Sequence, residues 1–159
     1  MQQHVNQTCR DGQHLARRRG LPGYREPVRR SAVVDHGLQR RAVLAAVRAG
    51  RVSALDVCDA SPYLQRAAER LGVRTERTCP VCRKVPLDEV HWVYGDALGD
   101  ADGTARTGGQ VAALAADRPD FAVYEVEVCQ GCGWNHLVRS WRTGTPGTVP
   151  ARRSRRREA

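Results

Sequence analysis

Two cysteine pairs form the clearest chemical pattern in the sequence: Cys-Pro-Val-Cys at 79–82 and Cys-Gln-Gly-Cys at 129–132. A two-residue gap lets a tight turn direct two thiolates at one metal ion, and two such pairs supply the four ligands of a structural zinc site. We therefore predict one structural Zn2+ ion bound by Cys79, Cys82, Cys129 and Cys132. A reduced redox dithiol, a disulfide pair, or the lack of a shared site are the alternatives.

Three residues after the second pair could support this site. His136 follows Cys132 at a spacing that suits a ligand, but four thiolates already complete a tetrahedral site. We therefore expect His136, Trp134 and Asn135 to support the ligands from outside the coordination sphere, or to contact a partner. Trp134 could either stack on a nucleic-acid base or fill the core.

A second group of polar residues lies in the stretch 96–109, which is rich in Gly, Asp and Thr and is expected to be a loop. Asp96, Asp100 and Asp102 could hold calcium or a catalytic metal, as in a nuclease, but the later ligands and final glutamate of a calcium loop are missing. The sequence also has no phosphate-binding loop and no nucleophile–base pair. We expect a protein that is not an enzyme.

Composition sets limits on fold and location. The chain has 159 residues, of which 41% are hydrophobic and 5% aromatic. Its core is therefore expected to be small, so that a bound metal ion would add needed stability. No apolar run is long enough to span a membrane, and residues 1–7 are polar. Six cysteines, four of them in CxxC pairs, fit a reducing compartment. We expect a cytoplasmic protein.

Positive charge is concentrated at the two ends of the chain. Residues 1–50 carry ten basic and three acidic side chains, whereas residues 79–150 carry six basic and nine acidic ones. Clustered arginines attract phosphate backbones without reading base sequence. The candidate nucleic-acid-binding residues are therefore Arg17, Arg18, Arg19, Arg152, Arg153, Arg155, Arg156 and Arg157. The alternative is an arginine-rich composition without such a role.

Alternating patterns place strands beside the cysteines. Residues 88–94 and 121–128 alternate between apolar and other residues, and 135–142 supply a return strand. The second pair would then be the tip of a hairpin. We expect a zinc ribbon over residues 74–142, with an inserted loop and a short helix at 110–116.

Helical spacing dominates the preceding segment. Apolar residues recur from Val33 to Val47, Ser53 begins a short second helix, and Ser61-Pro62 begins a third. These predict a three-helix module over residues 31–73, which could be a helix-turn-helix but is better suited to packing or partner binding. Cys58 is expected to be a buried thiol.

The predicted fold class is α+β, with a helical module followed by an antiparallel zinc-ribbon unit. We expect residues 1–30 to form a disordered basic arm and residues 143–159 to form a disordered arginine-rich tail. The motifs Val-Cys-Asp-Ala at 57–60, Cys-Pro-Val-Cys at 79–82, Val-Tyr-Gly-Asp at 93–96 and Val-Glu-Val-Cys-Gln-Gly-Cys-Gly-Trp-Asn-His-Leu at 126–137 resemble an actinobacterial family of unknown function. The resemblance implies a bacterial cytosolic protein and supports the zinc ribbon, but implies no activity.

Two functions are consistent with these features. The first is a non-enzymatic zinc-ribbon adaptor that binds a protein of the transcription or translation machinery, and nucleic acid through its basic arms. The alternative is a thiol-based redox or zinc-responsive sensor, in which oxidation of the four cysteines releases the metal.

Overall fold

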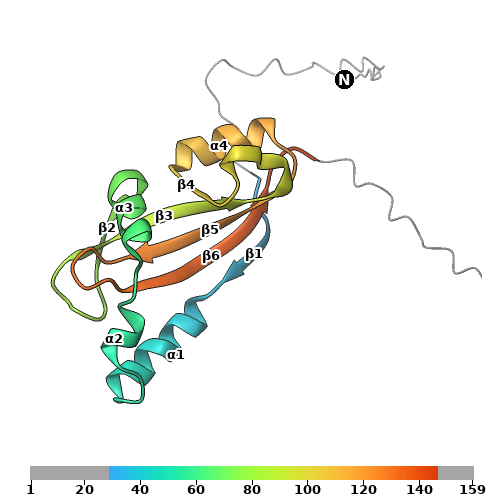
Figure 1. Ribbon diagram of the computed structural model, residues 1–159. Coiled ribbons are helices and arrows are strands. Elements are labelled where there is room, and N and C mark those ends of the chain that lie inside the picture. The colour runs from blue at the N-terminus through green and yellow to red at the C-terminus, as the bar shows by residue number, and fades with distance from the viewer. Residues whose placement is uncertain (1–28, 147–159) are drawn as a thin grey trace, which may run out of the picture.

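The computed structural model describes residues 29–146, which build one six-stranded antiparallel sheet and the helices that pack on it (Figure 1). The strands are β1 Ser31–Asp35, β2 Val73–Thr78, β3 Pro86–Tyr94, β4 Thr104–Arg106, β5 Phe121–Val128 and β6 Asn135–Thr143. The helices are α1 Gly37–Arg48, α2 Ala54–Val57, α3 Pro62–Leu71, the 3-10 helix η1 Asp96–Ala101 and α4 Gly108–Asp117.

The sheet has the strand order β1-β6-β5-β3-β2, and β4 pairs with β3 beyond the end of β2. The central strands β3, β5 and β6 are those that the alternating patterns predict. Val90 pairs with Val126 and Trp92 with Tyr124, so these four side chains share one face. Alternate residues such as Val93 and Val123 face the other way.

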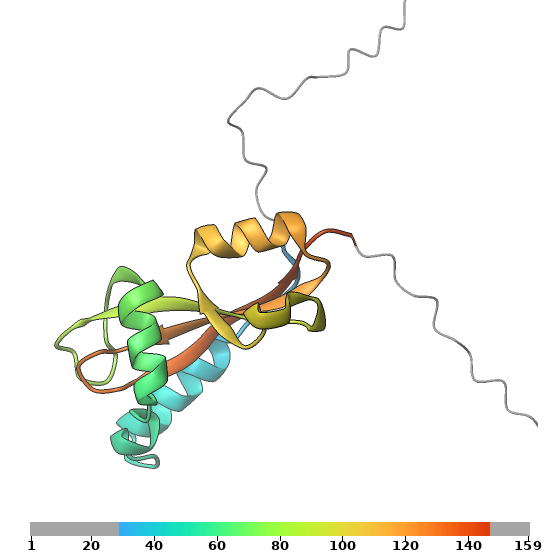
Figure 2. The ribbon, with the colours of Figure 1, turned by 45° about the horizontal axis from the view of Figure 1, so that its top comes forward.

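Each face of the sheet has its own helical cover. On the face of Val90, Ala67 and Ala68 of α3 join a core cluster with Val90, Trp92 and Val128. On the other face, Val111 of α4 packs with Val93, Val123 and Trp141. The helix α3 crosses the strands near the end that carries the cysteine turns, while α4 lies over the far part of the sheet (Figure 2).

The three helices of the predicted N-terminal module are present, and two begin at the predicted caps. The Ser53 hydroxyl accepts from the Leu55 amide, and the Ser61 hydroxyl accepts from the Leu64 amide, both at 3.2 Å. The helices do not form a module apart from the sheet, however, because α1 contacts β6 and α3 contacts β3, β4 and β5. Both α1 and α3 bury apolar residues toward the sheet, Leu44 in α1 and Ala67 and Ala68 in α3, whereas α2 buries none.

Three segments differ from the sequence prediction. Residues 31–35 are not the start of a helix but the edge strand β1, which pairs with β6. Residues 73–78, where the sequence pattern predicts no strand, form β2 because their backbone groups pair with β3. The stretch 96–109 is not an open loop, since it contains η1, β4 and the first turn of α4.

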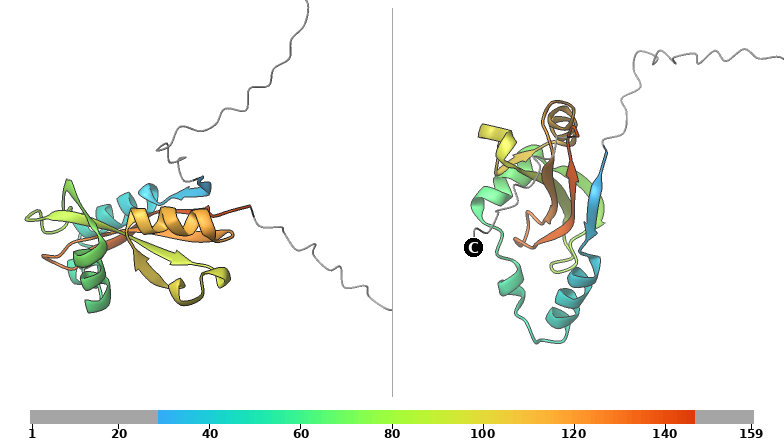
Figure 3. Two further views of the ribbon diagram at one scale, coloured as in Figure 1. Left: turned by 90° about the horizontal axis from the view of Figure 1, so that it is seen from above. Right: turned by 90° about the vertical axis from the view of Figure 1, so that its right-hand side faces the viewer.

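Both described ends of the chain leave the sheet at the end opposite the cysteine turns (Figure 1). Viewed along the sheet, β1 and α3 lie on opposite sides of the molecule (Figure 3, right). Among the described helices, none is long and apolar enough to cross a membrane.

Candidate metal centre

Both cysteine pairs lie in hairpin turns at one end of the sheet. Cys79 and Cys82 lie between β2 and β3, and Cys129 and Cys132 lie between β5 and β6. Because β3 and β5 are antiparallel neighbours, the turn before β3 meets the turn after β5. The topology thereby joins cysteines that are 47 and 53 residues apart in sequence.

The two turns share a backbone geometry. In each, the amide four residues after the first cysteine donates to that cysteine's carbonyl, from Arg83 to Cys79 and from Gly133 to Cys129, both at 3.0 Å. Both donors have positive φ, 56° for Arg83 and 81° for Gly133. Glycine suits the positive φ at Gly133, while at Gly131 an added Cβ would lie 3.0 Å from Val85 Cγ2.

The four sulfur atoms have the spacing of a tetrahedral metal site. They all lie within 4.8 Å of one another, and the Cys79–Cys132 and Cys82–Cys129 sulfur distances are both 3.7 Å. Four thiolates about 2.3 Å from a tetrahedral zinc ion would lie about 3.8 Å apart. Cys79 and Cys129 are buried, and the other two are half-buried. The donor set and its dimensions fit one metal ion.

Burial opposes the ionisation of three of these thiols. It raises the pKa of Cys79 and Cys129 above the usual value and that of Cys132 to about 12. Burial acts in the same direction on Cys82, but hydrogen bonds from the Lys84 amide and neighbouring thiols outweigh it and lower the pKa of Cys82 to about 7. Four thiolates would therefore need a cation beside them, and metal binding would release protons.

A fifth cysteine lies against the cluster. Cys58 Sγ is 3.5 Å from Cys132 Sγ. The segment 57–60 is held there by the Ala60 amide, which donates to the Gly133 carbonyl at 2.9 Å, and by Asp59, which accepts from Asn135 Nδ2 at 2.9 Å. Cys58 is half-buried, and burial raises its pKa. It is therefore a neighbour of the site, where the sequence predicts only a buried thiol.

An apolar layer supports the cysteines from inside. Trp134 is fully buried and packs in one cluster with Leu44, Leu87, Cys79 and Cys129. Its indole Nε1 donates to Glu127 Oε1 at 2.8 Å, so the ring is fixed and is not free to stack on a base. Of the two roles that the sequence left open for Trp134, the structure places it in the core.

Glu127 is the polar centre of this layer. Its side chain is fully buried, and Oε1 also accepts from Arg40 Nε of α1 at 2.6 Å. Arg77 of β2 lies 3.5 Å from the other carboxylate oxygen. The carboxylate thus joins α1, β2 and β5 behind the metal site. Glu127 is a functional candidate that the sequence analysis does not identify, because nothing in the sequence shows which arginines face it.

The other candidate residues lie outside the sulfur cluster. His136 stacks on Trp134 with ring centroids 5.8 Å apart, and burial lowers its pKa. Asn135 binds Asp59, as described above. Asp96, Asp100 and Asp102 are exposed. Among residues 29–146, the four cysteines are the only group of three or more His, Cys, Asp or Glu side chains placed to share a metal ion. Arg17–Arg19, the five tail arginines and Cys9 lie outside the described residues.

Comparison with known proteins gives a family but no activity. The chain is 48% identical over 111 residues to Uncharacterized protein Rv0049 of Mycobacterium tuberculosis. The aligned region covers 70% of this chain and 81% of that protein. The same values hold for Uncharacterized protein Mb0050 of Mycobacterium bovis. No solved structure matches the chain. The family model described as "Family of unknown function (DUF5318)" matches residues 27–158, so the resemblance to a family of unknown function is confirmed and the chain belongs to DUF5318.

Proposed function

We propose that the metal is a single structural Zn2+ ion and that the protein is a cytoplasmic, non-enzymatic zinc-ribbon-like adaptor. The carrying observation is the cluster of four sulfurs within 4.8 Å of one another. A site closed by four thiolates leaves no position for a substrate or an activated water, which favours a structural ion over a catalytic one. Thiolate ligands favour zinc over magnesium or calcium.

The proposed partner is a protein of the transcription or translation machinery, and arginines in the two ends would add attraction to nucleic acid. Zinc ribbons are frequent accessory modules in these assemblies, which is an argument by analogy of fold. The metal would act by holding two hairpin turns and the segment 57–60 in one surface. Asn135 and Asp59 lie in that surface.

Metal content tests the first half of the proposal. Purified full-length protein is expected to contain one zinc per chain by mass spectrometry of the metal, and Cys79→Ser or Cys129→Ser to lose most of it. Cys58→Ser is the matched control, because Cys58 is not one of the four clustered ligands. Full zinc in both ligand variants, or iron in place of zinc, would refute the assignment.

A pull-down tests the adaptor role. Tagged full-length protein is expected to retain RNA polymerase or ribosomal proteins after nuclease treatment, and Cys129→Ser to lose them. Partners that vanish with nuclease would argue against a protein contact. A zinc-loaded protein that retains neither set of proteins would refute the adaptor role while leaving the metal assignment intact.

One observation favours a redox sensor as the second candidate: Cys58 Sγ lies 3.5 Å from Cys132 Sγ. Peroxide would oxidise one thiolate to a sulfenic acid with release of water, and attack by the second thiol would form a disulfide and release a second water. A disulfide that includes Cys132 removes one zinc ligand, so the ion would leave.

Zinc release measures this reaction. With a chromogenic zinc chelator present, hydrogen peroxide is expected to release zinc from the wild type several-fold faster than from Cys58→Ser. A mass spectrum of the oxidised wild type should contain a Cys58–Cys132 disulfide. Equal release rates in the two proteins would eliminate this mechanism.

A further inference from the structure

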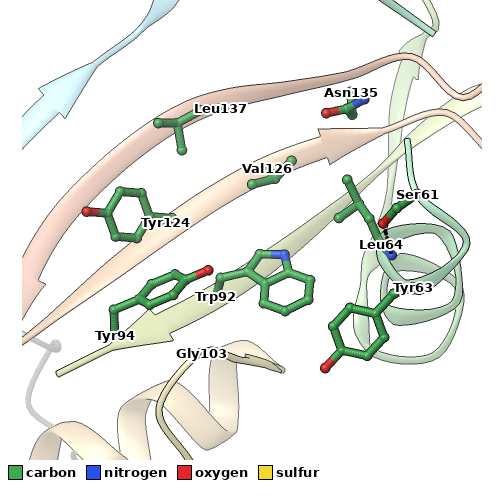
Figure 4. A pocket seen from close by; sticks show the side chains of 10 residues that line it. All are labelled: Ser61, Tyr63, Leu64, Trp92, Tyr94, Gly103, Tyr124, Val126, Asn135 and Leu137. Carbon is green, nitrogen blue, oxygen red and sulfur yellow. Dashed lines mark hydrogen bonds between the residues drawn. The ribbon is translucent and has the colours of Figure 1, made fainter. Parts of the chain in front are cut away.

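A groove with four aromatic side chains lies on the sheet face that α3 partly covers (Figure 4). Its volume is about 770 Å³. The floor is formed by β3, β5 and β6, one wall by α3, and another by the chain at Gly103. The cysteine cluster does not line it.

The aromatic rings form two pairs. Tyr63 packs on Trp92 with ring centroids 5.4 Å apart, and Tyr94 packs on Tyr124 at 5.3 Å with perpendicular planes. Trp92 is only 8% exposed, whereas Tyr63 is 56% and Tyr94 45% exposed. The outer rings are therefore positioned by inner rings and still offer area to a ligand. A flat, unsaturated group can stack on such rings.

The groove itself carries no charge. All the side chains that line it are neutral, and two of its polar side chains, Ser61 and Asn135, bind within the protein. The Ser61 hydroxyl accepts from the Leu64 amide, and Asn135 Nδ2 donates to Asp59 and to the Gly133 carbonyl. The groove therefore favours a planar, uncharged group.

Positive charge lies directly beside it. A neighbouring hollow between α3 and β4 shares Tyr63 with the groove and contains Arg66, Arg70 and Arg106. In the part of the chain that the structure describes, six arginines form ion pairs with carboxylates, whereas these three do not, and neither do exposed arginines elsewhere such as Arg41 and Arg48. Two carboxylates at the edge of the groove are engaged, since Asp102 accepts from the Gly95 amide and Asp59 from Asn135, while Glu69 of α3 is exposed beside Arg70.

We propose that this face binds single-stranded nucleic acid, with bases stacked on Tyr63 and Tyr94 and phosphates bound by Arg66, Arg70 and Arg106. Neutral aromatic area beside unpaired arginines is the combination that accepts bases and a phosphate backbone together. A duplex cannot use it, because its bases are already stacked. A proline-rich peptide could use the rings but would leave the three arginines without a partner. The proposal depends on neither the metal nor the adaptor role.

Fluorescence anisotropy of the full-length protein with labelled oligonucleotides tests the proposal. The probes are oligothymidylate of about 12 nucleotides and a duplex of equal length. The single strand is expected to bind more tightly, and Tyr63→Ala or Tyr94→Ala to raise its Kd at least about fivefold. Tyr94→Phe keeps the ring and should bind as the wild type does. None of these variants should change the Kd for the duplex, whose attraction to the basic ends is independent of the groove.

The arginines have a matched control. The double variant Arg66→Ala/Arg70→Ala is expected to weaken single-strand binding more than Arg41→Ala/Arg48→Ala, which removes the same charge from exposed positions on α1. Circular dichroism and metal content should confirm that each variant is folded. Equal affinity for single strand and duplex, unchanged binding by both tyrosine variants, or binding of a proline-rich peptide in place of the oligonucleotide would overturn the proposal.

Discussion

Replacement of Glu127 by alanine should destabilise the protein more than any exposed acidic substitution. The substitution removes the acceptor of the Trp134 indole at 2.8 Å and of Arg40 Nε at 2.6 Å. Trp134 is fully buried, and the Arg40 side chain is only 23% exposed. Water therefore cannot fully replace the lost carboxylate.

The expected magnitude follows from what remains behind. A buried indole N–H without an acceptor costs about 1–3 kcal/mol. Removing one partner of a buried ion pair costs about 3–5 kcal/mol in total, because the other charge stays partly desolvated. We expect Glu127→Ala to lower the free energy of unfolding by about 3–5 kcal/mol. Glu127→Gln keeps an oxygen acceptor for the indole and should cost about 2 kcal/mol.

Urea denaturation at one fixed concentration of free zinc is the suitable assay, since a bound ion shifts apparent stability by mass action. Glu89→Ala is the matched control: Glu89 lies opposite Glu127 in the pairing of β3 with β5, but the cation that its removal leaves unpaired, Arg77, is 47% exposed and accessible to water. That variant should lose no more than about 1 kcal/mol. A loss from Glu127→Ala as small as that from Glu89→Ala would refute the reasoning.

Three further predictions concern other parts of the molecule. Gly133→Ala should lower the free energy of unfolding by at least about 1–2 kcal/mol, because φ is 81° and the new methyl would lie 2.9 Å from the Cys58 carbonyl oxygen. Gly108→Ala is the control, since no atom lies within 4 Å of its added Cβ. Equal Tm values for the two variants would contradict the prediction. Leu87→Ala should lower the free energy of unfolding, measured by urea denaturation, by about 2–5 kcal/mol, because Leu87 is fully buried beside the cysteines. Leu55 is 82% exposed, so Leu55→Ala should change that free energy by less than about 0.5 kcal/mol. Burial lowers the pKa of His91 below its usual value of 6.5. Burial of the neutral ring therefore contributes fully to stability above pH 6.5, and this contribution is lost as the pH falls from 6.5 through the lowered pKa. The fall in Tm between about pH 7.5 and about pH 5.5 should be smaller in His91→Phe than in the wild type, and an equal fall would show that His91 is not responsible.

The central strands and the four clustered cysteines could be predicted because their signals are local. Residues 88–94 and 121–128 alternate along one strand each, and the CxxC spacing can be recognised within four residues. The hairpin that ends in Cys129 and Cys132 follows from the strand on either side. These parts of the prediction needed no knowledge of distant contacts.

The errors fall where the structure depends on distant partners. The strand β1 is exposed throughout and is stabilised by pairing with β6, so its two valines fit a helical stripe equally well in sequence. In β2 the polar residues Arg74, Glu76 and Arg77 hide the strand, and their role depends on Asp88 and Glu89 of β3. Neither pairing leaves a trace in the local pattern.

The site and the groove show the same limit. The position of Cys58 beside Cys132 depends on a contact between residues that are 74 apart. Alternation places Trp92 and Tyr94 on one face, but only the packing of α3 brings Tyr63 beside Trp92. The sequence therefore reveals the types of residue present on this face without showing that they surround a groove.

The pairing of β1 with β6 has a consequence for synthesis of the chain. Ser31 binds the backbone of Arg142, which is 111 residues later. At about 5–20 residues per second, a ribosome needs roughly 6–22 s to make the intervening chain. During that time β2 to β5 and both cysteine turns are made, while β1 has no partner strand until β6 follows. The N-terminal strand therefore docks last on the nascent protein, and its valines, which are still about half exposed after docking, are available to chaperones until then.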